Sequence, residues 1–251
     1  IIGFIPIIKD SSYKSTIVEE IYSNARSHLV QGNKEMGMAL FNELLAINES
    51  IYGKVNPETA KFYNLVAQVY QELGYDIEAA LIGRKAVILC ERSCGFDSYD
   101  TITAYMNSAY YESSNEQYLN SLKLYKEAMN TWSLVYGKDH PTLINTLTNL
   151  SESLLKIKAY DSALELLQEA LEITKKLNGE ISEITGFIYY RIANIVVTLN
   201  KFKESKELFD KAYDIFMKLL GPDDSMTKQV AKYVSSVGLY VEYLKRQQQQ
   251  Q

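Results

Sequence analysis

The residues best suited to chemistry are two histidines and two cysteines. His140 stands in the stretch GKDHP, directly after Asp139. An imidazole beside a carboxylate can act as a general acid or base near neutral pH. Cys90 and Cys94 lie four residues apart, and thiolates are both nucleophiles and metal ligands. Whether any of these groups does such chemistry depends on the elements that hold them.

The spacing of the cysteines favours packing over redox or zinc chemistry. They are one helical turn apart rather than in a C-x-x-C pair, and no histidine lies near them in sequence. We interpret them as reduced thiols, which suits a cytoplasmic protein. The chain contains no P-loop, G-x-G-x-x-G, H-E-x-x-H or G-x-S-x-G motif. We therefore expect a protein that is not an enzyme, without catalytic residues, metal or cofactor.

The composition predicts an all-α fold. Of 251 residues 47% are apolar, and only 4 are Pro and 12 are Gly, which is too few for a protein of many strands and turns. The net charge of −5 argues against a broadly basic nucleic-acid surface. No apolar run is long enough to span a membrane, and the opening IIGFIPII lacks signal-peptide flanks. We expect no membrane insertion, and the first residue, Ile1, suggests a piece excised from a longer protein.

Five glycines recur at an interval of 42 residues, so the chain is an array of one repeated unit. They are Gly53, Gly95, Gly137, Gly179 and Gly221. Small residues recur 14, 26 and 33 positions after each glycine, where close packing of two helices requires them. These positions are Ala67, Ala109, Ser151, Ala193 and Ser235; Ala79, Ser121, Ala163 and Ser205; and Ala86, Ala128, Ala170 and Ala212. Each unit is thus predicted to be two antiparallel helices joined by a short turn.

The same register assigns a structural role to His140. It lies three residues after its glycine, where the other units place Asn56, Ser98, Ser182 and Asp224. Short polar side chains at this place cap the amides of the first helical turn, so we interpret His140 as an N-cap and keep a catalytic role as the alternative. The glycine ends the preceding helix in the left-handed conformation.

The array is predicted to contain about 11 antiparallel helices over residues 15–246. The units cover about 15–52, 53–94, 95–136, 137–178 and 179–220, and a single capping helix covers 224–246. Residues 1–14 are expected to be a linker from a preceding region. The glutamines at 247–251 are expected to begin a disordered tail, with continuation of the last helix as the alternative.

Helical hairpins with small residues in these positions resemble tetratricopeptide repeats, and the 42-residue period with G-x-x-H-P resembles that of kinesin light chains. The ordered succession resembles more specifically the C-terminal repeat region of the clustered-mitochondria (CLU) family, from about residue 15 to 245. The segments that carry the likeness are KAV-x-L-x-ER, AYMN-x-A-x-Y and the departure from G-x-x-H-P in the second unit.

This resemblance implies a function. It implies an α-α superhelix, a tetratricopeptide-repeat solenoid, in a large cytoplasmic protein that binds mRNAs for mitochondrial proteins and keeps mitochondria properly distributed. Some members are linked to translation initiation complexes. A peptide or cargo adaptor like a kinesin light chain is the alternative.

In a tetratricopeptide superhelix the first helix of each unit lines a concave groove, so the register predicts its binding residues. They are Tyr22, Arg26, Lys61, Asn64, Gln68, Asn107, Tyr110, Asn145, Asn149, Tyr190, Arg191, Asn194, Lys232 and Tyr233.

Asn, Gln and Tyr side chains suit an extended peptide because they can donate to and accept from its backbone. Tyrosines can also stack RNA bases, but phosphate binding normally requires a clustered cationic stripe, and the register places only scattered bases in the groove. We expect a protein or peptide ligand, with mRNA or a ribonucleoprotein as the alternative. The ligand's identity and the oligomeric state stay open, and a purely structural or self-associating array is a third possibility.

Overall fold

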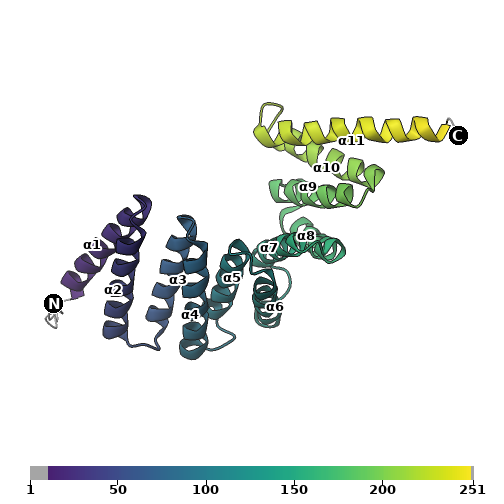
Figure 1. Ribbon diagram of the computed structural model, residues 1–251. Coiled ribbons are helices and arrows are strands. Elements are labelled where there is room, and N and C mark those ends of the chain that lie inside the picture. The colour runs from purple at the N-terminus through teal and green to yellow at the C-terminus, as the bar shows by residue number, and fades with distance from the viewer. Residues whose placement is uncertain (1–10, 250–251) are drawn as a thin grey trace. The chain divides into compact units, whose positions relative to one another are not determined.

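The computed structural model describes residues 11–249, and in this range the chain is all α (Figure 1). Eleven helices follow one another as antiparallel hairpins, and no strand occurs in this range. The helices are α1 Ser11–Val30, α2 Lys34–Tyr52, α3 Pro57–Glu72, α4 Asp76–Cys94, α5 Tyr99–Ser114, α6 Tyr118–Val135, α7 Pro141–Lys156, α8 Tyr160–Asn178, α9 Glu183–Thr198, α10 Phe202–Leu219 and α11 Ser225–Gln249. None of these helices combines the length and hydropathy needed to cross a membrane. The predicted all-α fold of helical hairpins is confirmed.

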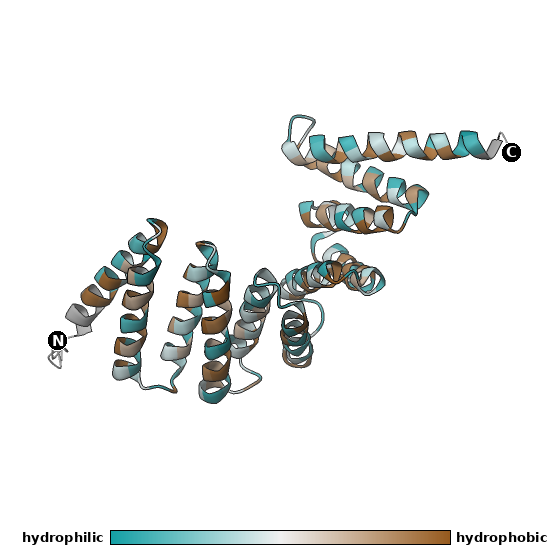
Figure 2. Cartoon of the chain, in the orientation of Figure 1, coloured by the Kyte–Doolittle hydropathy of each residue, from teal (hydrophilic) through white to brown (hydrophobic). Residues whose placement is uncertain are grey.

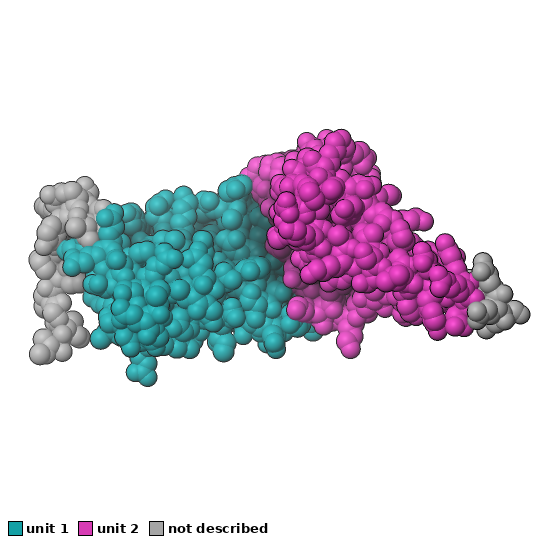
Figure 3. Space-filling model, turned by 90° about the horizontal axis from the view of Figure 1, so that it is seen from above, with its two compact units in different colours: residues 1–128 teal, residues 129–251 magenta. Residues whose placement is uncertain are grey.

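The chain divides into two compact units, residues 1–128 and 129–251 (Figure 3). The boundary falls within α6, whereas the sequence predicted one continuous array over 15–246. The predicted ends also differ from the structure. Helix α1 begins at Ser11, inside the predicted linker, and α11 continues to Gln249, inside the predicted glutamine tail. Most of that linker and the last two glutamines lie outside the described residues.

Small side chains fill the helix crossings at the predicted positions. Ala86, Ala163, Ala170 and Ala212 are all fully buried. Hydrophobic and hydrophilic residues alternate along the helices (Figure 2). Because a methyl group occupies so little space, two helix axes can approach closely at these points. Ser235 on α11 is the exception, since it is exposed and its hydroxyl bonds only to the Ala231 carbonyl of its own helix. No second helix follows α11 in the described residues to cover it.

The joints between hairpins repeat one set of backbone contacts. All five register glycines have positive φ, between 83° and 95°. Gly53, Gly95 and Gly179 have ψ of 157°, 161° and 171°, so they lie in an extended conformation that essentially only glycine adopts and not in the predicted left-handed helical one. Each predicted N-cap accepts a backbone N–H of its own first turn, for example Asn56 from Glu58 at 2.9 Å. A third contact was not predicted. Thr59, Thr101 and Thr185 donate their hydroxyls to the carbonyl of the register glycine six residues earlier, at 2.8, 2.6 and 3.0 Å.

The turn inside each hairpin also repeats every 42 residues. Its central residue has positive φ in all five hairpins, namely Gly32, Gly74, Glu116, Lys158 and Asn200. The next amide donates to a carbonyl five residues back, as Ala159 does to Leu154 at 2.9 Å. This Schellman arrangement ends the first helix and turns the chain. Three of the five turns thus have a non-glycine residue in a positive-φ conformation that glycine adopts with the least steric strain.

The close helix crossing at Ala170 can be tested by overpacking. Ala170→Leu should lower the free energy of unfolding by about 1 to 3 kcal/mol, because the buried site has no room for a larger side chain. The exposed neighbour gives a matched control, and Glu169→Leu should change stability by less than about 0.5 kcal/mol. Denaturant unfolding measures both, and an unchanged midpoint for Ala170→Leu would contradict the assignment.

The left-handed turn at Lys158 predicts a stabilising substitution. Lys158 is exposed with φ of 61°, so Lys158→Gly should raise the free energy of unfolding by about 0.5 to 1 kcal/mol by removing Cβ strain. In the interior of α8, by contrast, Gln168→Gly should lower it by about 1 kcal/mol. Thermal and denaturant unfolding of the two variants provide the check, and a destabilised Lys158→Gly would refute this explanation.

Candidate ligand-binding faces of the first helices

The predicted binding residues fall into two sets, one in each compact unit. We call the first the unit 1 face, on α1, α3 and α5; it comprises Tyr22, Arg26, Lys61, Asn64, Gln68, Asn107 and Tyr110. The second is the unit 2 face, on α7, α9 and α11; it comprises Asn145, Asn149, Tyr190, Arg191, Asn194, Lys232 and Tyr233. Each face is described by itself.

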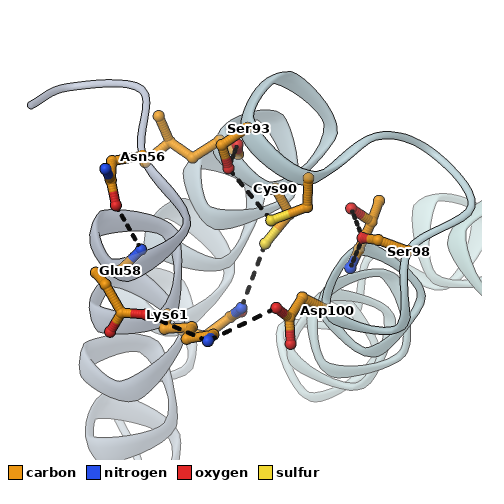
Figure 4. Close-up of polar contacts among 11 residues, drawn as sticks. Asn56, Glu58, Lys61, Cys90, Ser93, Ser98 and Asp100 are labelled. Carbon is orange, nitrogen blue, oxygen red and sulfur yellow. Dashed lines mark hydrogen bonds and ion pairs between the residues drawn. The ribbon is translucent and has the colours of Figure 1, made fainter.

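The cations of the unit 1 face are engaged with carboxylates. The Lys61 ammonium lies 3.3 Å from Glu58 of its own helix and 3.8 Å from Asp100 of α5 (Figure 4). These carboxylates raise the pKa of Lys61. Arg26 on α1 reaches Glu72 on α3 at 3.3 Å. The two basic side chains therefore connect neighbouring first helices rather than standing as free positive charge.

Two other residues of the unit 1 face turn toward the interior. Tyr22 is half-buried and packs edge-to-face on Phe41, with ring centroids 5.7 Å apart. Asn64 is also half-buried, and its side-chain amide donates to the Cys90 sulfur at 3.8 Å. Burial raises the pKa of the Cys90 thiol to about 12, so this cysteine stays protonated near neutral pH. Gln68 and Tyr110 are exposed on this face, whereas Asn107 is half-buried like these two.

The unit 2 face combines one ion pair with an aromatic cluster. Arg191 on α9 donates to Glu152 on α7 at 2.7 Å. The Tyr233 ring stacks on Phe209, with centroids 5.2 Å apart and planes 14° apart, and meets Tyr190 edge-on at 5.7 Å. The Tyr190 hydroxyl accepts from the amide of Gln229 at 2.9 Å. Tyr190 and Tyr233 therefore hold each other in fixed orientations.

Four contacts between successive first helices share one sequence separation. Residues 39 positions apart meet in Gln71–Tyr110, Glu152–Arg191, Tyr190–Gln229 and Lys61–Asp100. Since the repeat is 42 residues long, each of these four contacts meets the next first helix three residues earlier in the register, whereas Arg26–Glu72 and Tyr190–Tyr233 join residues 46 and 43 positions apart. Three residues are about one helical turn. Within each unit, side chains of successive first helices thus meet with an offset of about one helical turn.

Three residues of these faces escaped the sequence prediction. Leu65 and Phe187 are 41% and 39% exposed and occupy the same register positions as predicted polar residues. Glu152 occupies another and pairs with Arg191. The prediction selected only side chains that can hydrogen bond or carry positive charge. The same register positions would also have identified these three residues. Both faces therefore include apolar and acidic contact area.

His140 occupies the capping place that the register assigned to it. Its Nδ1 accepts the backbone N–H of Thr142 at 3.2 Å, and its ring lies 4.8 Å from that of Trp132. An Nδ1 that accepts this bond carries no proton. No group of three or more His, Cys, Asp or Glu gathers as a metal site in the described part of the chain. What the two faces offer is amide, hydroxyl and aromatic surface.

Comparison with known folds identifies the repeat. Tetratricopeptide-repeat family models match residues 59–100 and 100–176. The crystal structure of a Podospora anserina kinesin light chain with nearly identical repeats, described as putative, aligns with a TM-score of 0.68 at 16% identity. That alignment covers 81% of this chain and 96% of that one. The structure of BtubC (BKLC) from P. vanneervenii aligns with a TM-score of 0.67 at 20% identity, covering 82% of each chain. The predicted tetratricopeptide-repeat fold is confirmed.

Curated relatives match along nearly the whole chain. A clustered mitochondria protein homolog of Lodderomyces elongisporus is 60% identical over 250 residues, which are 100% of this chain and 18% of the relative. The homolog of Debaryomyces hansenii is 46% identical, covering 100% of this chain and 19% of the relative. That of Aspergillus clavatus is 33% identical over 94% of the chain and 19% of its own length. The chain thus spans about a fifth of the relatives it matches.

The capping role of His140 makes a specific prediction. His140→Ala and His140→Asn both lose the ring contact with Trp132, but only asparagine retains a short acceptor for the Thr142 amide. The Asn variant should therefore be more stable than the Ala variant by about 1 kcal/mol. Equal free energies of unfolding in parallel denaturant titrations would show that the cap contributes nothing.

Proposed function

Because this chain belongs to the clustered mitochondria protein family, of whose members it spans about a fifth, we propose that it is a non-catalytic scaffold segment. Its first-helix faces bind an extended peptide of a partner protein. Through that partner it serves the distribution of mitochondria in the cytoplasm, a proposal that the name of the clustered mitochondria relatives supports. Association of the same protein with mRNA and translation initiation complexes belongs to the proposal as a property of the whole protein.

The neutralised charge of the two faces is the observation that supports a peptide most. Arg26, Lys61 and Arg191 each pair with a carboxylate of their own unit. Binding a nucleic acid through them would mean breaking these pairs, and the carboxylates would then repel the phosphates. A peptide backbone needs donors and acceptors instead, which Asn107, Asn149 and the other amides supply without net charge.

RNA binding is the second candidate, and one observation favours it. Tyr110 and Tyr233 are exposed aromatic rings, and Lys232 stands exposed on α11 beside Tyr233. Aromatic rings stack unpaired bases, and a nearby lysine can contact a phosphate. Such binding would weaken steeply with added salt because counterions are released when phosphates are neutralised.

A pull-down with the 251-residue chain separates the two candidates. Extract is divided, one half is treated with nuclease, and the retained protein and RNA are identified. We expect partner proteins to survive nuclease treatment. The triple variant Asn107→Ala, Asn145→Ala, Asn149→Ala should lose them, because it removes three amides of the first-helix faces while leaving the ion pairs intact.

A matched variant controls for nonspecific loss. Asn42→Ala, Asn130→Ala and Gln168→Ala remove three exposed amides from the second helices α2, α6 and α8, and this variant should retain every partner. Loss of all partners after nuclease would replace the peptide proposal with the RNA candidate. Partners that survive nuclease and bind both variants equally would exclude the first-helix faces as the site.

A further inference from the structure

Helix α11 exposes a side that the other first helices bury. In α1, α3, α5, α7 and α9 the small residue at one position of the repeat is fully buried, namely Ala25, Ala67, Ala109, Ser151 and Ala193. Ser235 holds this position in α11 and is exposed. Leu239, one turn further along the same side, is 70% exposed. We call Ser235 and Leu239 the open side of α11.

The first hairpin shows what covers the equivalent side elsewhere. Ala25 and Leu29 of α1 correspond in register to the open side, and Gly37 of the second helix α2 packs against both. A Cβ atom added to Gly37 would lie 2.6 Å from the Leu29 side chain and 3.0 Å from the Ala25 carbonyl oxygen. The later second helices all place a small, buried residue where α2 has Gly37, namely Ala79, Ser121, Ala163 and Ser205. The open side therefore has the shape that accepts a helix with a small residue at the crossing.

The hairpin turn that would bring a second helix is replaced in α11 by further helix. Helices α3, α5, α7 and α9 have 16 residues each, and a turn residue with positive φ follows every one of them. Helix α11 has 25 residues, and Glu242 occupies the place of that turn residue. Because α11 continues as a helix through this place, the chain does not fold back there onto the open side.

The charge of α11 is mostly positive. The helix contains one acidic residue, Glu242, and four basic ones, Lys228, Lys232, Lys245 and Arg246, although the whole chain has a net charge of −5. Lys228 pairs with Asp223 at 3.2 Å. Lys245 and Arg246 are exposed, and no carboxylate of the described residues pairs with either of them. The carboxyl-terminal end of α11 thus has positive charge that its surroundings leave unbalanced.

The charges have fixed places relative to the open side. Arg246 lies seven residues after Leu239, which is two turns further along the same side. Glu242 stands between them, and it is exposed. Toward α10 the border is neutral, because Lys206 and Asp210 pair with each other at 2.6 Å. A ligand of the open side therefore meets a small residue, a leucine, one carboxylate and then two cations.

We propose that the open side of α11 docks a helix of a separate protein, which runs antiparallel to α11 as a second helix does. A small residue of this helix meets Ser235 and Leu239, so the two axes approach closely. Acidic residues about two turns before that small residue then face Lys245 and Arg246, because the helices run in opposite directions. One turn before it the helix has a neutral or basic residue, which faces Glu242.

A second copy of this chain does not supply such a helix. The small residues of its second helices are buried within its own hairpins, so it can offer only α11 itself. Each α11 carries four basic residues and one acidic residue, and two such helices repel each other. The proposal does not depend on the first-helix faces, since neither Ser235 nor Leu239 belongs to the unit 2 face.

A synthetic helix tests the chemistry directly. The probe has the sequence of α8, residues 160–178, preceded by the extension Ala-Ala-Ala-Glu-Glu-Ala-Ala, which places the glutamates six and seven residues before Ala163. A matched peptide has lysines instead of these glutamates. Calorimetric titration of the 251-residue chain should show that the glutamate peptide binds at least about tenfold more tightly than the lysine peptide. No binding, or equal binding of both peptides, would overturn the proposal.

Substitutions in the chain locate the binding. Lys245→Glu combined with Arg246→Glu should reverse the preference, so that the lysine peptide binds more tightly. Ser235→Gln should weaken the binding of both peptides by about tenfold, because its bulk separates the helices. The control, Lys156→Glu combined with Lys158→Glu, changes the net charge equally at two exposed positions of another turn and should leave the preference unchanged. A reversal in the control would show that only net charge matters and would contradict the site.

Photocrosslinking identifies the natural occupant. The chain carries p-benzoylphenylalanine at position 239 or, in the control, at position 236, and crosslinked segments are identified by mass spectrometry after irradiation in extract. We expect position 239 alone to capture a helical segment of another protein with a small residue and acidic residues two turns before it. A synthetic peptide of that segment should bind the unsubstituted chain and lose affinity with Ser235→Gln. Crosslinks only to a second copy, to lipid or to RNA, or the same products at both positions, would overturn the assignment.

Two measurements keep a negative result interpretable. Circular dichroism and thermal unfolding should show that Ser235→Gln folds like the unsubstituted chain, because Ser235 is exposed. The variant should also retain the nuclease-resistant partners of the first-helix faces. Loss of those partners together with the helix probe would mean that the two surfaces are not separate, which contradicts the proposal.

Discussion

The close approach of paired helices at small side chains is the constraint on which the rest of the structure depends. Residues such as Ala86 and Ala170 occupy the crossing points, where their lack of bulk lets each pair of helices pack without a gap. These alanines recur every 42 residues from the second hairpin to the fifth, whereas the first hairpin has Leu44 in the same place. The outer residues of each hairpin are then free to differ, and that freedom carries the functional variation.

The regular stagger between first helices determines what their faces can offer. A step of 39 residues along the chain brings side chains of successive helices together, and in Lys61–Asp100 and Glu152–Arg191 it pairs opposite charges. These pairs are solvated, so each adds little stability. Their larger effect is on the charge of the faces, because Arg26, Lys61 and Arg191 each pair with a carboxylate while Lys232 stays exposed.

Periodicity made most of the fold predictable from one sequence. The glycines, the N-caps and the buried small residues recur at fixed positions of the repeat, so aligning the repeats identifies them. The short turns inside the hairpins were predicted, but their left-handed backbone was not, because Glu116 and Lys158 rarely adopt it and only Asn200 is of a type that tolerates it. The apolar residues of the candidate faces, such as Phe187, were missed for another reason: only side chains that hydrogen bond or carry positive charge were selected, although an apolar side chain can also be exposed at these positions. No feature of the local sequence indicates that the boundary between the two compact units falls within α6.

The threonine contact at the joints has a consequence for how such an array deforms. Thr59, Thr101 and Thr185 each tie a joint by holding the carbonyl of its glycine, whereas Leu143 stands at the equivalent place after Gly137 and has no hydroxyl to do so. After Gly221 the same place holds Thr227, whose buried hydroxyl makes no hydrogen bond, so the contact is present in three of the five joints described. A substitution at this buried position would therefore change how firmly one joint is held without altering the side chains of the first-helix faces.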